Sequence, residues 1–158
     1  MSTIETPPAT KIVIVGLSVT ETTVNTYKNE KVEVPNSQNA KAAFLLGYTM
    51  DTAQVQCGTS ELGIITGSLL VGDLTARTGM ALINTVGCVD KVENYMAKDA
   101  SGIIVAISNR DPMTKKCPSP VPIPKTADGK FYLTAEVLAT LATSARSLYC
   151  KAYVGLIL

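Results

Sequence analysis

Few residues in this chain are of a type that does chemistry, and their spacing in the sequence does not bring them together. Histidine is absent, which removes His-based catalytic triads, histidine metal sites and histidine pH switches. Cys57 stands beside Gly58, Thr59 and Ser60 and has the side chain of a nucleophile. No imidazole exists to activate that thiol, and no other activating group is evident in the sequence. The pattern therefore favours a buried core thiol at Cys57.

The segment 58–63 has the glycine spacing of a phosphate-binding loop. Ile64 and Ile65, however, stand where that loop needs a lysine followed by a serine or threonine. No side chain at these positions can contact a β-phosphate. We therefore expect no nucleotide binding here.

The carboxylates are equally dispersed along the chain. A hydrolytic pair of the glycosidase kind needs two carboxyl groups about 5–9 Å apart in a deep cleft, and no spacing in this sequence sets such a distance. The candidates are Asp51, Glu61, Asp73, Asp90, Glu93 and Asp99. We expect no enzyme activity and no cofactor.

Four cysteines are spread through the sequence, and none belongs to a Cys-x-x-Cys pair, which disfavours a metal site. They are Cys57, Cys88, Cys117 and Cys150. An even number permits two disulfides in three pairings. We favour free, mostly buried thiols that act as small apolar side chains, with disulfides as the alternative.

The composition points to a surface that is partly covered by partners. Apolar residues make up 46% of the 158, whereas charged residues make up only 17%, below the roughly 25% of a typical globular protein. The net charge of +1 offers no basic surface for nucleic acid. Aromatic residues are 5% and tryptophan is absent, which disfavours stacking on sugars or bases. Either Thr, Ser and Asn cover the surface, or other subunits do, and we favour the second.

The elements that must position these residues are organised around segment 62–89. It carries only two charges, and five glycines divide its apolar residues into short pieces. Short pieces rich in Ile, Val, Leu and Thr and bounded by Gly predict buried strands. A membrane helix would need about 18 uninterrupted apolar residues. We therefore predict a mainly β single domain over 11–158, a sandwich or jelly-roll-like arrangement of about seven to nine strands with one or two short helices. The alternative is an α+β fold with both helices on one sheet.

Individual elements follow from local periodicity. The strand predicted over 11–20 is apolar on both faces, so it is either buried on both or lies between subunits. Thr134 and Glu136 begin a predicted helix over 134–146, and good helix formers predict a second over 38–46. The charged segment 90–99 is predicted to be an exposed turn or one helical turn. Further strands are predicted over 31–34, 48–57, 102–108, 131–133 and 148–158.

Three segments are candidates for contacts with other subunits. Residues 1–10 are polar and predict a flexible arm, and the alternating prolines within 109–128 predict a long polyproline II surface loop, either a stiff connector or a contact arm. The apolar end of the chain must be buried against its own sheet or against a neighbour. The candidate interface residues are Pro7, Pro8, Pro118, Pro120, Pro122, Val154, Leu156, Ile157 and Leu158.

Together these features favour a structural protein that works by homo-oligomeric assembly. Low charge, abundant small apolar residues and extended segments are typical of viral and bacteriophage virion components, such as capsid, decoration and vertex proteins. We expect partners to be other copies of this chain, as a trimer or pentamer, and other capsid proteins, with no nucleic acid and no membrane. Since no secretory signal or transmembrane segment is evident, we expect synthesis in a host cytoplasm and location in the virion. The alternative is a non-catalytic binding module or adhesin that recognises a surface ligand.

Overall fold

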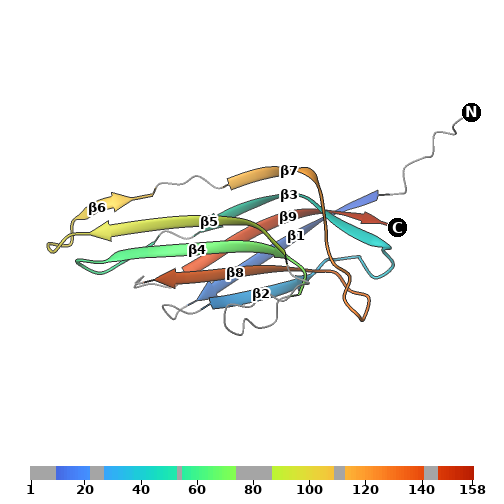
Figure 1. Cartoon of the computed structure of the whole chain (residues 1–158), viewed down its shortest axis with the longest axis horizontal. Coiled ribbons are helices and arrows are strands. Elements are labelled where there is room, and N and C mark those ends of the chain that lie inside the picture. The colour runs from blue at the N-terminus through green and yellow to red at the C-terminus, as the bar shows by residue number, and fades with distance from the viewer. Residues whose placement is uncertain (1–9, 22–26, 53–54, 74–86, 109–112, 141–145) are drawn as a thin grey trace, which may run out of the picture.

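Two antiparallel β-sheets pack face to face in this chain (Figure 1). The structure is a computed structural model, and it describes residues 10–21, 27–52, 55–73, 87–108, 113–140 and 146–158. Every regular element within these ranges is a strand, so the described residues include no helix that could cross a membrane. This confirms the predicted mainly β sandwich, with nine strands.

The strands divide unequally between the two sheets. In spatial order the four-stranded sheet consists of β1 (Thr10–Glu21), β9 (Arg146–Ile157), β3 (Ala42–Thr52) and β7 (Met113–Pro122). The five-stranded sheet consists of β2 (Tyr27–Glu33), β8 (Tyr132–Thr140), β4 (Leu62–Val71), β5 (Gly87–Lys98) and β6 (Ile104–Ile107).

The pairing of the strands is nested. With the short strand β6 set aside, the first strand pairs with the last, the second with the second last, β3 with β7, and β4 with β5. These pairs alternate between the two sheets, as if one long hairpin had been rolled up. This order is that of a jelly roll.

Period-two alternation builds the core between the sheets. On β1 the side chains of Val13, Val15, Leu17 and Val19 are buried, whereas the intervening residues are exposed. On β8, Leu133, Ala135 and Val137 are completely buried from the opposite side. Within this chain, the strand predicted over 11–20 is therefore buried on one face only. The prediction that both of its faces are buried within the chain is thus excluded, which leaves the predicted position between subunits.

The predicted helices are wrong where the structure describes them. The prediction over 134–146 falls on β8 and the start of β9, with residues 141–145 outside the described ranges, and the prediction over 38–46 falls on a turn and on β3. Segment 90–99 belongs mostly to strand β5. The reason is tertiary: β8 pairs with β2 on one side and β4 on the other, and such pairing overrides the modest helix propensity of Ala, Leu and Glu.

The predicted loop over 109–128 contains strand β7, an edge strand that tolerates its prolines. The amide of Ile123 donates a hydrogen bond to the carbonyl of Ala43 at 2.9 Å. Because backbone groups alternate across a strand, the nitrogen of Pro122 points away from β3, toward the open edge. A proline there removes no ladder bond, which is why prolines are confined to edge strands. Beyond the strand, a turn closes with the amide of Gly129 donating to the carbonyl of Thr126.

Gly67 of β4 faces the core directly beneath Leu148 of β9. A Cβ at this position would come within 2.6 Å of Leu148 Cδ1, which is itself completely buried. We predict that Gly67→Ala lowers the free energy of unfolding by about 1–3 kcal/mol through overpacking. Gly16→Ala on β1 is the matched control, because no atom lies within 4 Å of a Cβ there. Urea denaturation should show the control to be neutral or up to about 1 kcal/mol more stable; equal losses in both variants would contradict this packing.

Candidate functional site

The predicted interface residues separate into a buried and an exposed group. Val154 and Leu156 are completely buried in the chain's own core, so the C-terminal strand needs no neighbour to cover them. Ile157 is half-buried, and Leu158 is 46% exposed. Pro118, Pro120 and Pro122 are exposed on β7. Pro7 and Pro8 lie outside the described residues.

Three residues outside the core, Pro120, Pro122 and Ile157, belong to a larger apolar surface on the outside of the four-stranded sheet, which we call the outer apolar face. Register aligns its members across the strands: Ile12 lies opposite Gly155, Gly155 opposite Phe44, and Phe44 opposite Pro122. Ile12 and Ile14 are 63% and 58% exposed, high values for such large apolar side chains. The outer apolar face comprises Ile12, Ile14, Phe44, Leu46, Pro120, Pro122, Tyr153 and Ile157.

Gly155 opens a groove in the middle of this face. A Cβ at that position would come within 3.2 Å of Leu46 Cδ1 and 3.4 Å of Thr10 Cγ2, so any larger residue would begin to fill the depression. The groove is lined by Thr10, Phe44, Leu46, Pro120, Gly155 and Ile157. Such a lining offers contact area rather than hydrogen bonds.

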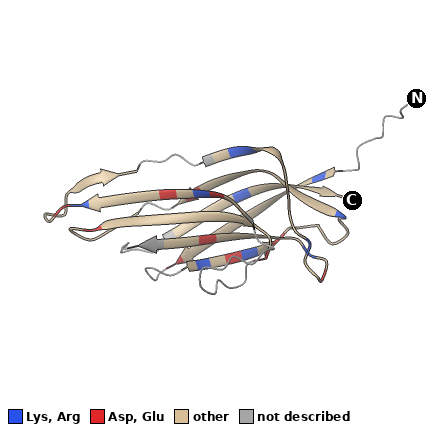
Figure 2. Cartoon of the chain, in the orientation of Figure 1, with Lys and Arg blue, Asp and Glu red and all other residues tan. Residues whose placement is uncertain are grey.

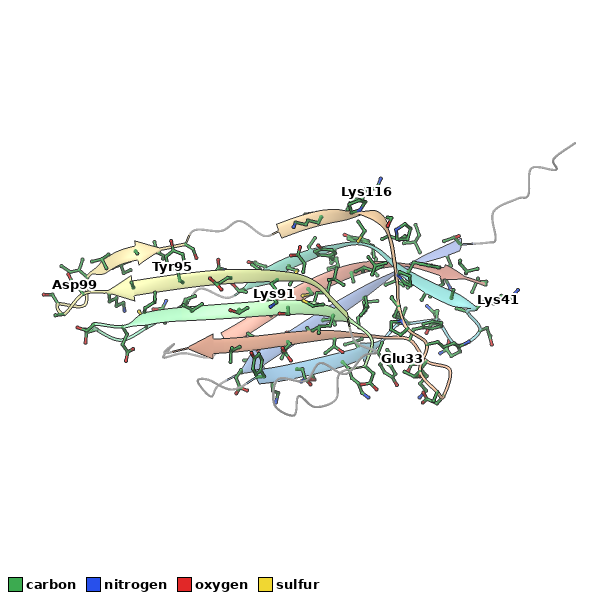
Figure 3. All side chains as sticks on the ribbon, in the orientation of Figure 1. Glu33, Lys41, Lys91, Tyr95, Asp99 and Lys116 are labelled. Atoms are coloured by element: carbon green, nitrogen blue, oxygen red, sulfur yellow. The ribbon has the colours of Figure 1, made fainter. Side chains whose placement is uncertain are left out.

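Lysines flank the outer apolar face. Lys41 precedes β3 and Lys116 lies on β7 (Figure 3). Lys151 lies on β9, among the basic positions coloured blue in Figure 2, and all three lysines are exposed. Lys116 is opposite Gly47, and Lys151 is opposite Thr49. The face therefore combines an apolar centre with positively charged flanks; an apolar core with a polar rim is the usual anatomy of a protein contact surface.

A second apolar surface lies at the other end of the molecule, on strand β6 and the residue that precedes it. Ile103, Ile104 and Val105 are 62%, 48% and 62% exposed. The sequence predicted a strand here but not its exposure, since a short apolar run is also the pattern of a buried strand.

The outer side of the five-stranded sheet carries a small polar pocket of about 130 Å³. The carboxylate-bearing Glu136 is only 2% exposed although it belongs to the outward row of β8. Lys91, Ser68 and Thr66 supply further polar groups. The complete lining is Tyr27, Thr66, Ser68, Leu70, Cys88, Lys91, Glu136 and Leu138. These groups can hold a small polar ligand through hydrogen bonds, and sequence reasoning missed them because the lining residues come from four different strands.

A polar cluster joins the two sheets at one side of the sandwich. The hydroxyl of Tyr48 on β3 donates to Asp90 Oδ2 on β5 at 2.6 Å, and Lys115 Nζ on β7 lies 3.0 Å from the same oxygen. Burial raises the pKa of Tyr48, and the bond to Asp90 raises it further. Burial also raises the pKa of Asp90, but the hydrogen bonds from Tyr48 and Lys115 outweigh it and the pKa is lowered overall. Neither group changes protonation near neutral pH, so the interactions of this cluster connect the two sheets throughout that pH range.

Three of the other five candidate carboxylates have separate structural contacts. Asp73 pairs with Lys31 at 2.9 Å, and Asp99 Oδ1 accepts the amides of Ser101 and Ile103 in the turn before β6. Glu61 accepts the amide of Gly58, so the loop that has phosphate-binding spacing is a turn closed by its own side chain.

All four cysteines are free thiols in this structure, as the sequence favoured. Cys57 and Cys150 are buried, Cys117 is half-buried and Cys88 is exposed. The thiol of Cys57 donates to the carbonyl of Met96 at 3.3 Å, in the environment expected for a core residue. Among the residues that the structure describes, no three His, Cys, Asp or Glu side chains are grouped as metal ligands.

Comparison with known proteins gives little. No protein-family model matches the chain, and no curated protein matches its sequence. Among solved structures, the chain is similar to one from Desmodium yellow mottle tymovirus, with a TM-score of 0.40, 8% identity, and coverage of 99% of this chain and 91% of that one. It is also similar to one from Bacillus endospore appendages, described as a novel family of disulfide-linked pili, with a TM-score of 0.36, 14% identity, and coverage of 100% and 98%. At TM-scores this low, neither likeness establishes a function.

The cluster of Tyr48, Asp90 and Lys115 predicts a specific acid sensitivity of the folded state. Since the folded-state pKa of Asp90 is lowered, its stabilisation is present above the ordinary carboxyl pKa and is lost as the pH falls through the lowered value. We expect Tyr48→Phe to lower the free energy of unfolding by about 1 kcal/mol at neutral pH. The stability difference between wild type and Asp90→Asn should shrink in urea titrations as the pH falls from about 7 to about 2. A difference that is constant over this range would contradict a charged, hydrogen-bonded Asp90.

Proposed function

We propose that this chain is a structural protein that acts by assembling with copies of itself, as a component of a virion. The observation that supports this most directly is the outer apolar face, above all the exposure of Ile12 and Ile14. Contiguous exposed apolar surface is characteristic of sites of protein association. Fully burying one Ile side chain contributes about 1.5–3 kcal/mol relative to leaving it in water.

Strand β1 gives the physical reason for a second layer. Its inner row is apolar at Val13 and Val15, and its outer row is apolar at Ile12 and Ile14. A strand that is apolar on both faces belongs between two layers. The chain's own five-stranded sheet supplies one layer, and in our proposal another copy supplies the other.

The lysines around the outer apolar face favour a heterologous contact. A symmetric face-to-face pair would bring Lys116 and Lys151 toward their own copies, where like charges repel. A contact with a different surface of the next copy avoids this. Heterologous contacts that close generate rings. This fits the trimer or pentamer expected from the sequence.

The virion is the setting that best fits this combination of features. Jelly rolls serve as capsid and lectin domains, among other uses, so the fold alone is only an analogy. A role in a capsid needs a contact surface that is repeated in every subunit, and the outer apolar face is a surface that every copy of the chain carries. Capsid, decoration and vertex positions all satisfy this, with other capsid proteins as further partners.

The polar pocket on the five-stranded sheet favours one rival, a binding module or adhesin. Its groups, including Glu136, Lys91 and Ser68, could hold a polar surface ligand such as a glycan. This rival predicts a well-behaved monomer that binds on a glycan array and loses binding in Ser68→Leu.

The assembly proposal predicts a charge-sensitive oligomer. We expect the wild-type chain to be oligomeric in light scattering after size exclusion and Ile14→Lys to be largely monomeric, because a buried lysine at the contact must be desolvated. Ser18→Lys is the matched control, since Ser18 is exposed on the same row of β1 outside the outer apolar face. A wild type that remains monomeric at high concentration, or equal effects of the two lysines, would overturn the proposal.

A further inference from the structure

The nine residues that precede the first described residue have the composition of a segment that binds in an apolar groove. Segment 1–9 contains two consecutive prolines, Pro7 and Pro8. Proline fixes φ at about −65°, and a residue that precedes a proline is held extended, so the sequence over 6–8 favours a stiff polyproline II stretch. A stretch that is stiff before it binds loses less conformational freedom on binding than an ordinary flexible arm.

The groove of the outer apolar face matches the chemistry of such a segment. Of its six lining residues, only Thr10 has a polar atom in its side chain, whereas Phe44 and Pro120 present apolar rings. A proline has no backbone N–H, so a proline pair leaves no donor unsatisfied against this lining. Aromatic-lined grooves that bind polyproline II segments use the same match.

The charges around the groove also suit this segment. Lys41 and Lys116 flank the groove (Figure 3). Segment 1–9 has no lysine or arginine, and its one acidic side chain is Glu5. The segment therefore meets the flanking lysines without like-charge repulsion, unlike a second copy of the outer apolar face.

The direction of β1 indicates whose segment binds. Ile157 lies opposite Thr10, and Gly155 lies opposite Ile12, so the groove extends alongside the residues that follow Thr10. A segment that continues β1 backwards in extended form runs the other way and leaves its own groove behind. Only two residues lie between the stretch held extended and β1, and a reversal that short would place the segment alongside β1, not across β9 and β3. The groove of a neighbouring copy is the better fit.

We infer that segment 1–9 of one copy binds in the groove of the next copy, with its proline pair against Phe44 and Pro120. An extended segment of nine residues spans at most about 30 Å, enough to pass from one subunit to its neighbour. The contact is heterologous, because a segment on one copy meets a groove on another, and repeated contacts of this kind can close a ring. The inference rests on the proposed function and names the partner of that same outer apolar face.

Complementation between two full-length variants tests the exchange of segments. The first, Pro7→Lys combined with Pro8→Lys, loses the stiff apolar stretch and brings positive charge toward the flanking lysines. The second, Gly155→Val, fills the groove, since a Cβ at this position already comes within 3.2 Å of Leu46 Cδ1. In sedimentation velocity, each variant alone should associate at least about tenfold more weakly than the wild type. A mixture of equal amounts should form a dimer and nothing larger, because the intact segment of the second variant binds the intact groove of the first.

Two further variants separate loss of the groove from loss of the fold. Pro120→Lys changes an exposed groove residue and should behave as Gly155→Val does, so it takes the place of Gly155→Val if circular dichroism shows that this variant does not fold. Pro118→Lys is the matched control, because it makes the same substitution at an exposed position of β7 that does not line the groove. It should associate as the wild type does.

The outcomes distinguish this inference from the proposed function. A dimer in the mixture, with both components weakened alone, supports the exchange of segments. An oligomeric wild type together with a mixture that shows no dimer overturns the exchange and leaves the proposed function standing, and so does undiminished association of the variant with both proline substitutions. A wild type that stays monomeric at high concentration overturns the proposed function, and with it the inference that rests on it.

Discussion

The pairing of the first and last strands is the interaction on which the rest of this structure depends. Strand β1 pairs with β9 over its whole length, from Thr10 opposite Ile157 to Glu21 opposite Arg146. Strand β9 also pairs with β3, so it is one of the two inner strands of the four-stranded sheet. This pairing buries Val154 and Leu156 on the inner side, and on the outer side it places Ile12 and Ile14 next to the glycine of the groove. The core and the outer apolar face are thus two sides of one ladder.

Much of the strand content is predictable because short apolar runs bounded by turn residues have few other solutions. Predictions over 11–20, 102–108 and 148–158 correspond to β1, β6 and β9. The prediction over 134–146 failed for a physical reason: Thr134 and Glu136 resemble the start of a helix, whereas Leu133, Ala135 and Val137 alternate with the period of a strand. The sequence does not reveal that β2 and β4 flank this segment. The alternating prolines likewise made this edge strand hard to predict. A proline lacks the backbone N–H donor, and that lack disrupts a sheet only where the proline nitrogen faces a paired strand.

The candidate surface was only partly predictable. The sequence placed Val154 and Leu156 on one face of the last strand, and the structure makes that face the core. It also offered an intersubunit position for a strand apolar on both sides, which the exposure of Ile12 now favours. The groove depends on the placement of Gly155 close to Thr10 and Leu46, which are distant in the chain, and that placement follows only from register. The exposure of β6 could not be predicted from the sequence, since buried strands and edge strands share the same short apolar pattern.

The central claim is that this chain exists as an assembly of its own copies. Native mass spectrometry of the unmodified chain across a range of concentrations tests it most directly. The account predicts that the main species has a mass equal to a small whole-number multiple of 16.7 kDa, and that this species gives way to monomer only on dilution. A single species of 16.7 kDa at every concentration would contradict it.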